Sequence, residues 1–294
     1  MAATDSSRPP RDESVSDGLY FGDVLCAIDG TPESLAAVEQ AAVLAGPSGH
    51  LTLLAVTSYK SAGASRSPAI GPIEAKRMLD RAVRIAEEAE VPSTVEVDPA
   101  APPSRVILDW AAGRDLLAMG APATSWFGGM FTGGVAVAAE GSFTTPLLLA
   151  RSRPSGQHYS GHRIVVASDG LDGSDELVEL AGQLARAQGA SVILLHATGL
   201  ESGAARHHIR SRIQEQARRL QLTVDGASDR LENGSARTVI VETASAVGAS
   251  LVVMSSRRLT GLRAIGSVSR RVVHQGHCSV LLMPPERLLQ RPVL

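Results

Sequence analysis

The chain has 294 residues, of which 44% are hydrophobic and 20% charged, and its formal net charge is −2. This length predicts two domains, and the composition is typical of a soluble globular protein. The balanced charge and an aromatic content of 3% argue against a nucleic-acid binder or a membrane-surface protein. No apolar stretch reaches the roughly 18 residues that span a bilayer, and the polar N-terminus lacks the apolar segment of a signal peptide. We therefore expect a cytoplasmic protein.

Apolar runs alternate with helix-like patterns along the first half of the chain. Residues 23–28 predict a strand buried on both faces, and Thr31-Pro32 predicts the N-cap and first position of a helix. Gly46-Pro47 ends this helix, and a second strand is expected at 51–56. Further along, we expect helices at 72–89 and 104–113 and strands at 93–97, 115–120 and 146–150.

Two further patterns predict which side chains are buried. The cysteines, Cys26 and Cys278, lie inside apolar runs, so we expect buried thiols rather than a disulfide or a metal site. The helix expected at 72–89 is amphipathic, and its apolar side chains fall near one face. Those side chains are Ile73, Met78, Ala82 and Ile85.

The chain is an internal duplication. VLCAIDGTPES at 24–34 and IVVASDGLDGS at 164–174 match at an offset of 140, and the match continues to Leu54 and Leu194 without a gap. Strands separated by helices predict right-handed crossovers and parallel sheets. We therefore expect an α/β fold of two tandem open, mainly parallel five-stranded sheets with helices on both faces. The expected divisions are a disordered tail at 1–19, domains at 20–151 and 162–288, a linker at 152–161, and a tail at 289–294.

Several motifs of the first half are similar to those of a known family. Asp29-Gly30-Thr31 follows the first strand, with Ser34 three positions later, and the fourth strand ends in Met119-Gly120. A glycine-rich loop and a closing apolar strand follow. With its repeat, the chain resembles a tandem member of the universal stress protein family over nearly its whole length. This resemblance implies a Rossmann-like fold of the adenine-nucleotide alpha-hydrolase type, and many members bind ATP.

The two halves depart differently from the family's phosphate loop, which reads Gly, two residues, Gly, nine residues, Gly, then Ser or Thr. In the first half, Ala123 replaces the second glycine and Gly134 replaces the hydroxyl residue. In the second half, Ser255 and Arg258 replace the first two glycines, and the loop is two residues shorter. Glycines let backbone amides close around phosphates, so we expect the first half to be the better nucleotide site.

The resemblance implies a set of nucleotide-binding residues. Asp29 would hold the ribose, Ala27 and Val56 would line the adenine pocket, and His196 would take the place of Val56 in the second half. The positions implied as cofactor-binding are Ala27, Asp29, Gly30, Val56, Met119, Gly120, Gly133, Gly134, Ala167, Asp169, Gly170, Gly266, Ser267 and Ser269. A competing interpretation is that the glycines serve only tight turns and that Asp29 caps the following helix.

Three functions remain open at this level. The first is an ATP-binding regulatory or stress-response protein, with Mg, that acts by nucleotide-dependent binding rather than catalysis. The second is a tandem scaffold that binds no nucleotide, and the third is an enzyme of a related adenine-nucleotide fold, such as an adenylyl transferase. A cyclic-nucleotide-binding variant is a further alternative. No catalytic motif is present, so we expect no enzyme beyond slow ATP hydrolysis, and no metal site. Because family members pair their last strands, we expect an intramolecular pseudo-dimer through 146–150 and 279–283, and a homodimer built on it.

Overall fold

The fold consists of two similar five-stranded halves. The computed structural model describes residues 21–57, 71–100, 103–121, 145–152, 163–171, 173–199, 203–255 and 267–284. The expected tails and nearly all of the linker lie outside these residues. The first half contains β1 (Asp23–Ala27), α1 (Pro32–Ala45), β2 (His50–Val56), α2 (Pro72–Glu88), β3 (Ser93–Asp98), α3 (Pro103–Ala111), β4 (Leu116–Gly120) and β5 (Leu147–Ala150). The second half contains β6 (Arg163–Ala167), α5 (Ser174–Gln188), β7 (Ser191–Thr198), α6 (Gly203–Thr223), β8 (Ser228–Asn233), α7 (Ala236–Ala246), β9 (Leu251–Ser255), α8 (Ser267–Gln275) and β10 (Ser279–Met283).

In the described part of the chain, the strands of both halves form one ten-stranded sheet in the order β3-β2-β1-β4-β5-β10-β9-β6-β7-β8. Neighbouring strands run parallel except β5 and β10, which pair antiparallel with Leu148 opposite Leu281. The predicted pairing of the two last strands is therefore confirmed. It joins the two expected five-stranded sheets edge to edge and pairs the backbone edge that each last strand would otherwise leave open, and the side chains of both strands are buried.

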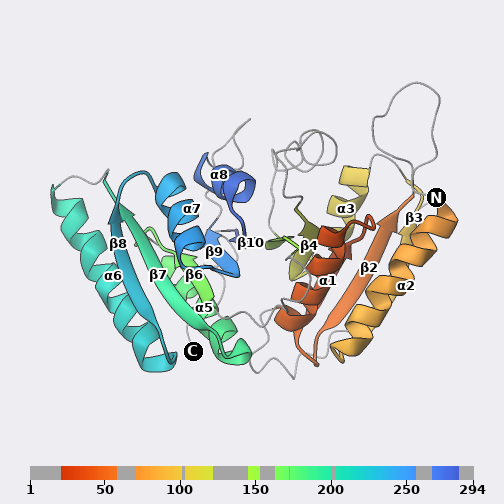
Figure 1. Ribbon diagram of the computed structural model, residues 1–294, viewed down its shortest axis with the longest axis horizontal. Helices are drawn as coiled ribbons and strands as arrows, with labels where there is room; N and C mark the ends of the chain where they lie inside the picture. The colour runs from red at the N-terminus through yellow and green to blue at the C-terminus, as the bar shows by residue number, and fades with distance from the viewer. Residues whose placement is uncertain are drawn as a thin grey trace.

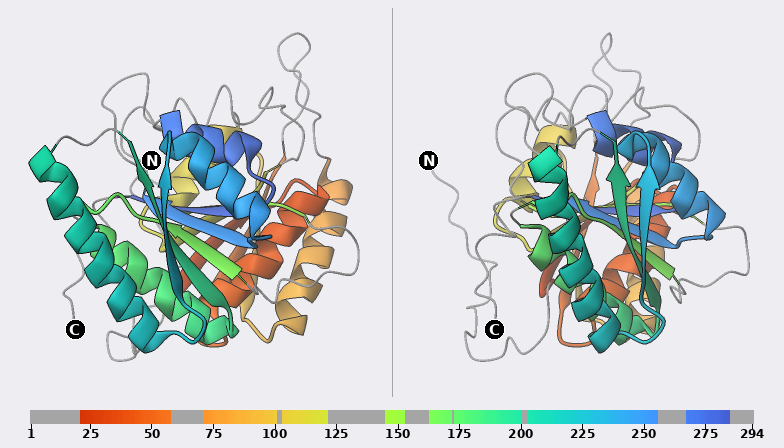
Figure 2. Two further views of the ribbon diagram at one scale, coloured as in Figure 1. Left: turned by 60° about the vertical axis from the view of Figure 1, so that its left-hand side comes forward. Right: turned by 90° about the vertical axis from the view of Figure 1, so that its left-hand side faces the viewer.

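Helices cover both faces of the sheet, as predicted (Figure 1). Buried residues of α1, α2, α5 and α6 form one apolar cluster, and those of α3, α7 and α8 form the other. α2 and α6 lie at opposite ends of the molecule, and Figure 2 shows α6 with its outer side uncovered by other elements. None of the helices in the described ranges is long and apolar enough to cross a membrane.

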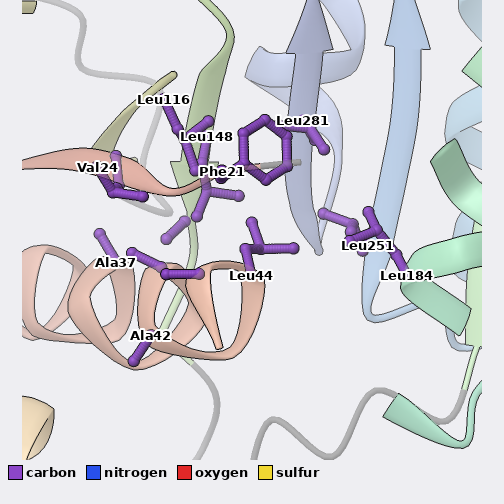
Figure 3. Packing of buried hydrophobic residues seen from close by; sticks show 14 of the residues in the cluster. Phe21, Val24, Ala37, Ala42, Leu44, Leu116, Leu148, Leu184, Leu251 and Leu281 are labelled. Atoms are coloured by element: carbon purple, nitrogen blue, oxygen red, sulfur yellow. The ribbon is translucent and has the colours of Figure 1, made fainter. Parts of the chain in front are cut away.

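The first core crosses the junction between the halves. Figure 3 shows Phe21 close to Leu148 and Leu281, with Leu44 of α1 facing Leu251 of the second half. Phe21, Leu148 and Leu281 are all fully buried. Burying such side chains typically stabilises a fold by about 1.5–3 kcal/mol each. The junction is therefore held by apolar packing as well as by backbone hydrogen bonds.

The predicted elements of the first half agree with the structure to within one or two residues. Cys26 and Cys278 are both buried, as expected, and they form no disulfide. One side-chain prediction is wrong, because Ile73 is 75% exposed. It lies two positions before the buried Ala75, which places it about 200° away around the helix. The buried row of α2 is Ala75, Met78, Leu79, Ala82 and Ala86.

Candidate functional site

The candidate site lies where the strand order of the first half reverses. β1 pairs with β2 on one side and with β4 on the other, so Ala27 stands opposite both Leu54 and Met119. Ligands of open parallel sheets bind at the carboxyl ends of strands at such a switch point. The sheet therefore brings together the ends of β1, β2 and β4, as the motifs implied.

Three of the implied residues line one face of the sheet at this edge. Ala27, Val56 and Met119 are buried and belong to the apolar cluster beneath α3. Asp29 lies two residues beyond Ala27 and is exposed. Apolar walls therefore adjoin a carboxylate at the end of β1.

Thr31 holds the carboxylate of Asp29 in place. The backbone amide and the hydroxyl of Thr31 both donate to Asp29 Oδ1, at 3.0 and 2.6 Å. Thr31 Oγ1 in turn accepts from the amide of Ser34 at 3.2 Å and so caps α1. The interpretation that Asp29 itself caps the helix is therefore wrong. Thr31 was missed as a site residue, although an aspartate side chain commonly accepts a hydrogen bond from the backbone two residues further on.

Two glycines at this edge are required by backbone geometry and close packing. Gly30 has φ +80°, a conformation that L residues rarely adopt. Gly120 ends β4 directly against the first turn of α1, where a Cβ atom would lie 2.5 Å from the amide nitrogen of Ser34 and 2.6 Å from the carbonyl carbon of Glu33. Gly120 therefore allows the strand and helix to approach, whatever else it binds.

The second half has the same aspartate-glycine turn, but its aspartate receives different hydrogen bonds. The amide of Leu171 donates to Asp169 Oδ1 at 2.9 Å, and Gly170 has φ +69°. Leucine stands where the first half has Thr31, so this carboxylate receives no hydroxyl from that position. Ala167 packs against the apolar cluster beneath α7 and α8 and stands opposite Met254.

His196 does not correspond to Val56. Ala27 pairs with Leu54, whereas Ala167 pairs with Leu195, so the second strand of the repeat is shifted by one residue. The shift arises because α5 ends three residues later than α1 within the repeat, while the connection that follows is two residues shorter. A one-residue shift moves a side chain to the other face of a sheet. Ala197 therefore occupies the position of Val56, and His196 is buried on the α5 and α6 face.

The phosphate-loop predictions fall largely outside the described residues. Gly133, Gly134 and Gly266 are not among them, and Ser267 is described only as the first residue of α8. Ser269 is buried within α8. In the described ranges, no group of three or more histidine, cysteine, aspartate or glutamate side chains is placed to hold a metal ion.

Comparisons with known proteins give the same fold. The model of the Universal stress protein family matches residues 21–151 and 161–284. A universal stress protein from Archaeoglobus fulgidus is 17% identical with a TM-score of 0.67, and the match covers 91% of this chain and 98% of that one. A functionally unknown protein from Pseudomonas aeruginosa is 19% identical with a TM-score of 0.63, covering 93% and 96%. No curated protein sequence matches significantly.

A membrane transporter also contains a similar domain. The cytoplasmic domain of a prokaryotic cation chloride cotransporter is 10% identical with a TM-score of 0.59, and the match covers 92% of this chain and 100% of that one. At these identities the likenesses show the fold alone.

Proposed function

Because the chain belongs to the universal stress protein family, we propose that it binds an adenine nucleotide in its first half and acts as a regulatory stress-response protein. Nucleotide-dependent binding to partners, not catalysis, would be its mode of action. The observation that carries this proposal is the exposed carboxylate of Asp29 beside Ala27 and Val56 at the switch point of the sheet.

The described residues fit the adenosine part of such a ligand. A carboxylate only accepts hydrogen bonds, which suits the paired hydroxyl donors of a ribose. Asp29 Oδ1 is occupied by Thr31, and within the described ranges Oδ2 receives no hydrogen bond. The small Ala27 and the apolar Val56 suit the face of a purine. Gly120, the last residue of β4, is the described residue that would approach the phosphates of bound Mg-ATP.

The first half is favoured over the second by two differences in its residues. Thr31 orients Asp29 through a hydroxyl that Leu171 lacks. Val56 is replaced by the smaller Ala197, which gives a purine less apolar surface. We therefore propose one nucleotide for each chain, with turnover no faster than slow ATP hydrolysis, in a cytoplasmic homodimer.

Isothermal titration calorimetry of the full chain with Mg-ATP tests the proposal. We expect one site, weakened at least about tenfold by Asp29→Asn, since hydrogen bonds to charged groups contribute about 1.5–3 kcal/mol. Asparagine keeps the oxygen that Thr31 contacts, so the turn should survive. The matched control is Asp169→Asn at the equivalent position of the second half, which should leave the affinity unchanged.

The alternatives give different results. No heat of binding with millimolar ATP, ADP or cyclic AMP, together with no nucleotide released from the denatured protein, would favour the scaffold and overturn the proposal. Tighter binding of cyclic AMP than of ATP would indicate the cyclic-nucleotide variant. Phosphate release at an enzymatic rate that Asp29→Asn abolishes would show a catalyst instead.

A further inference from the structure

Five buried apolar positions of the first half carry polar residues in the second. They lie together on the face covered by the first two helices of each half, directly beneath the aspartate-glycine turn. All five are buried in the first half, within its apolar cluster. Ile28, Leu35, Ala55, Met78 and Ala82 correspond to Ser168, Asp175, His196, Arg212 and Gln216. We call the second set the polar layer.

Hydrogen bonds of backbone amides and of two serine hydroxyls establish three of these equivalences. The amide of Ile28 donates to the carbonyl of Leu54, and that of Ser168 to the carbonyl of Leu195, so Ile28 matches Ser168. The residues after these two acceptors are Ala55 and His196, which therefore also match. The hydroxyls of Ser34 and Ser174 make the same local bond to a carbonyl three residues earlier, so the residues that follow them, Leu35 and Asp175, match as well.

The helices give the other two equivalences. The buried row of α2 includes Leu79, Ala82 and Ala86, and that of α6 includes Ile213, Gln216 and Leu220, at a constant offset of 134. The strands that follow have the same offset, because Leu54 pairs with Glu96 and Leu195 with Arg230.

Gln216 is the centre of the polar layer. Its amide oxygen accepts from the hydroxyl of Ser168 at 2.8 Å, and its amide nitrogen donates to Asp175 Oδ1 at 2.6 Å and to Ser174 Oγ at 2.8 Å. Arg212 donates to Asp175 Oδ2 at 3.1 Å. These bonds tie α6 to the end of β6 and to the first turn of α5.

The polar layer also supports the turn of the second candidate site. His196 Nδ1 lies 2.9 Å from the carbonyl oxygen of Ser168, and because a carbonyl only accepts, Nδ1 carries the proton. The hydroxyl of Ser168 accepts from the amide of Gly170 at 3.2 Å. The position of Gly170 thus depends on Ser168, which directly follows β6, and on side chains from β7 and α6.

A polar layer whose groups are hydrogen-bonded and an apolar layer respond differently when the helix that covers them separates from the sheet. If α6 lifts from the sheet, the polar groups regain hydrogen bonds with water, whereas an apolar layer loses its burial without compensation. Ser168, His196 and Gln216 are buried, whereas the side chains of Asp175 and Arg212 are 42% and 25% exposed. Replacing both partners of a buried hydrogen bond with apolar groups can be nearly neutral or stabilising, whereas removing one partner alone is destabilising. Local opening of the second half should therefore require less free energy than that of the first.

We propose that the polar layer is a latch, that is, a set of contacts whose breaking lets α6 and the β6–α5 turn separate from the sheet together. The corresponding contacts of the first half stay intact during this opening. Opening would displace the Asp169-Gly170 turn, so it would control any ligand held there. Only this last consequence rests on the proposed nucleotide function.

Hydrogen exchange of the full chain, followed by mass spectrometry, tests the latch. In the wild type, amides of α6 and of 168–175 should exchange at least about tenfold faster than those of α2 and of 28–35. Gln216→Ala should accelerate exchange further, because it removes the amide that bonds the hydroxyl of Ser168 and Oδ1 of Asp175. The five-residue replacement by the first-half residues (S168I, D175L, H196A, R212M, Q216A) should instead slow exchange in α6 to the rate of α2.

The matched control is Gln214→Ala, an exposed residue on the same helix. Equal exchange of the two halves in the wild type would overturn the latch, and this comparison needs no variant to fold. Equal effects of Gln214→Ala and Gln216→Ala would also overturn it. A chain that binds no nucleotide yet shows the expected exchange would overturn the proposed function alone.

Discussion

The guanidinium of Arg151, the first residue after β5, donates a hydrogen bond of 2.6 Å to the carbonyl oxygen of Val273 in the last turn of α8. The first half thus supplies a cation to the C-terminal end of a helix in the second half, where helix carbonyls lack intrahelical partners. The backbone amide of Arg151 also donates to Ser279 Oγ at 3.0 Å. Burial lowers the pKa of Arg151, and the nearby Cys278 and Glu33 act in the opposite direction.

Arg151→Met should destabilise the chain by about 1–3 kcal/mol, because the buried carbonyl of Val273 loses its charged donor. Urea unfolding measures this change, and hydrogen exchange should show it first in α8. The matched control is Arg163→Met, since Arg163 bonds the carbonyl of Val247 just after α7 but is exposed. That variant should cost less than about 1 kcal/mol. Equal losses for the two variants would refute a special role for burial at Arg151.

Thr31→Ala should lower the free energy of unfolding by about 0.5–2 kcal/mol, because it removes the N-cap of α1. It also removes the hydroxyl that donates to Asp29, so nucleotide affinity should fall with stability. Thr31→Ser keeps both bonds and should behave like the wild type. Thermal unfolding and titration with Mg-ATP on the three proteins check this. A Ser variant as impaired as the Ala variant would contradict it.

Gly120→Ala should destabilise the fold by about 1–3 kcal/mol or more even without any nucleotide, since the added methyl meets the backbone of α1. Loss of binding in this variant is therefore no evidence for a phosphate contact. Gly71→Ala is the control, because a Cβ there meets nothing within 4 Å. Chemical denaturation of both variants is the measurement. Unchanged stability of Gly120→Ala would mean that β4 and α1 separate easily.

Burial raises the pKa of the Cys26 thiol to about 12. The unfolded chain ionises this thiol near its ordinary value of 9.0, so the folded state loses stability as pH rises from about 9 to 12 and is unaffected below. Each pH unit in that window should cost about 1.4 kcal/mol. Urea unfolding at pH 8 and pH 10.5, for the wild type and Cys26→Ala, isolates this group. A parallel decline in both proteins would show that other groups cause the alkaline loss.

Local sequence predicted the elements and the turn of the first site because these depend on neighbouring residues. Thr31 and Pro32 begin α1, the apolar runs form buried parallel strands, and the repeated aspartate-glycine turns require positive φ at the glycines. The pairing of β5 with β10 could also be anticipated, since both are short apolar edges that another strand must cover.

The sequence could not predict which face of the sheet a side chain lies on where the helices and connections of the two halves differ in length. The sequence offset of 140 places His196 at the position of Val56, but the longer α5 and shorter connection shift β7 by one residue. Since successive side chains of a strand point to opposite faces, that single residue moves His196 out of the site and into the polar layer.

The length of 294 residues predicts two domains, and the repeat identifies them as copies of one unit. Only the tertiary structure shows that they differ beneath their equivalent turns, one resting on apolar side chains and the other on the polar layer. The physical reason is that Ser168, Asp175, His196, Arg212 and Gln216 come from α5, β7, α6 and the turn after β6, and packing alone decides which side chains meet.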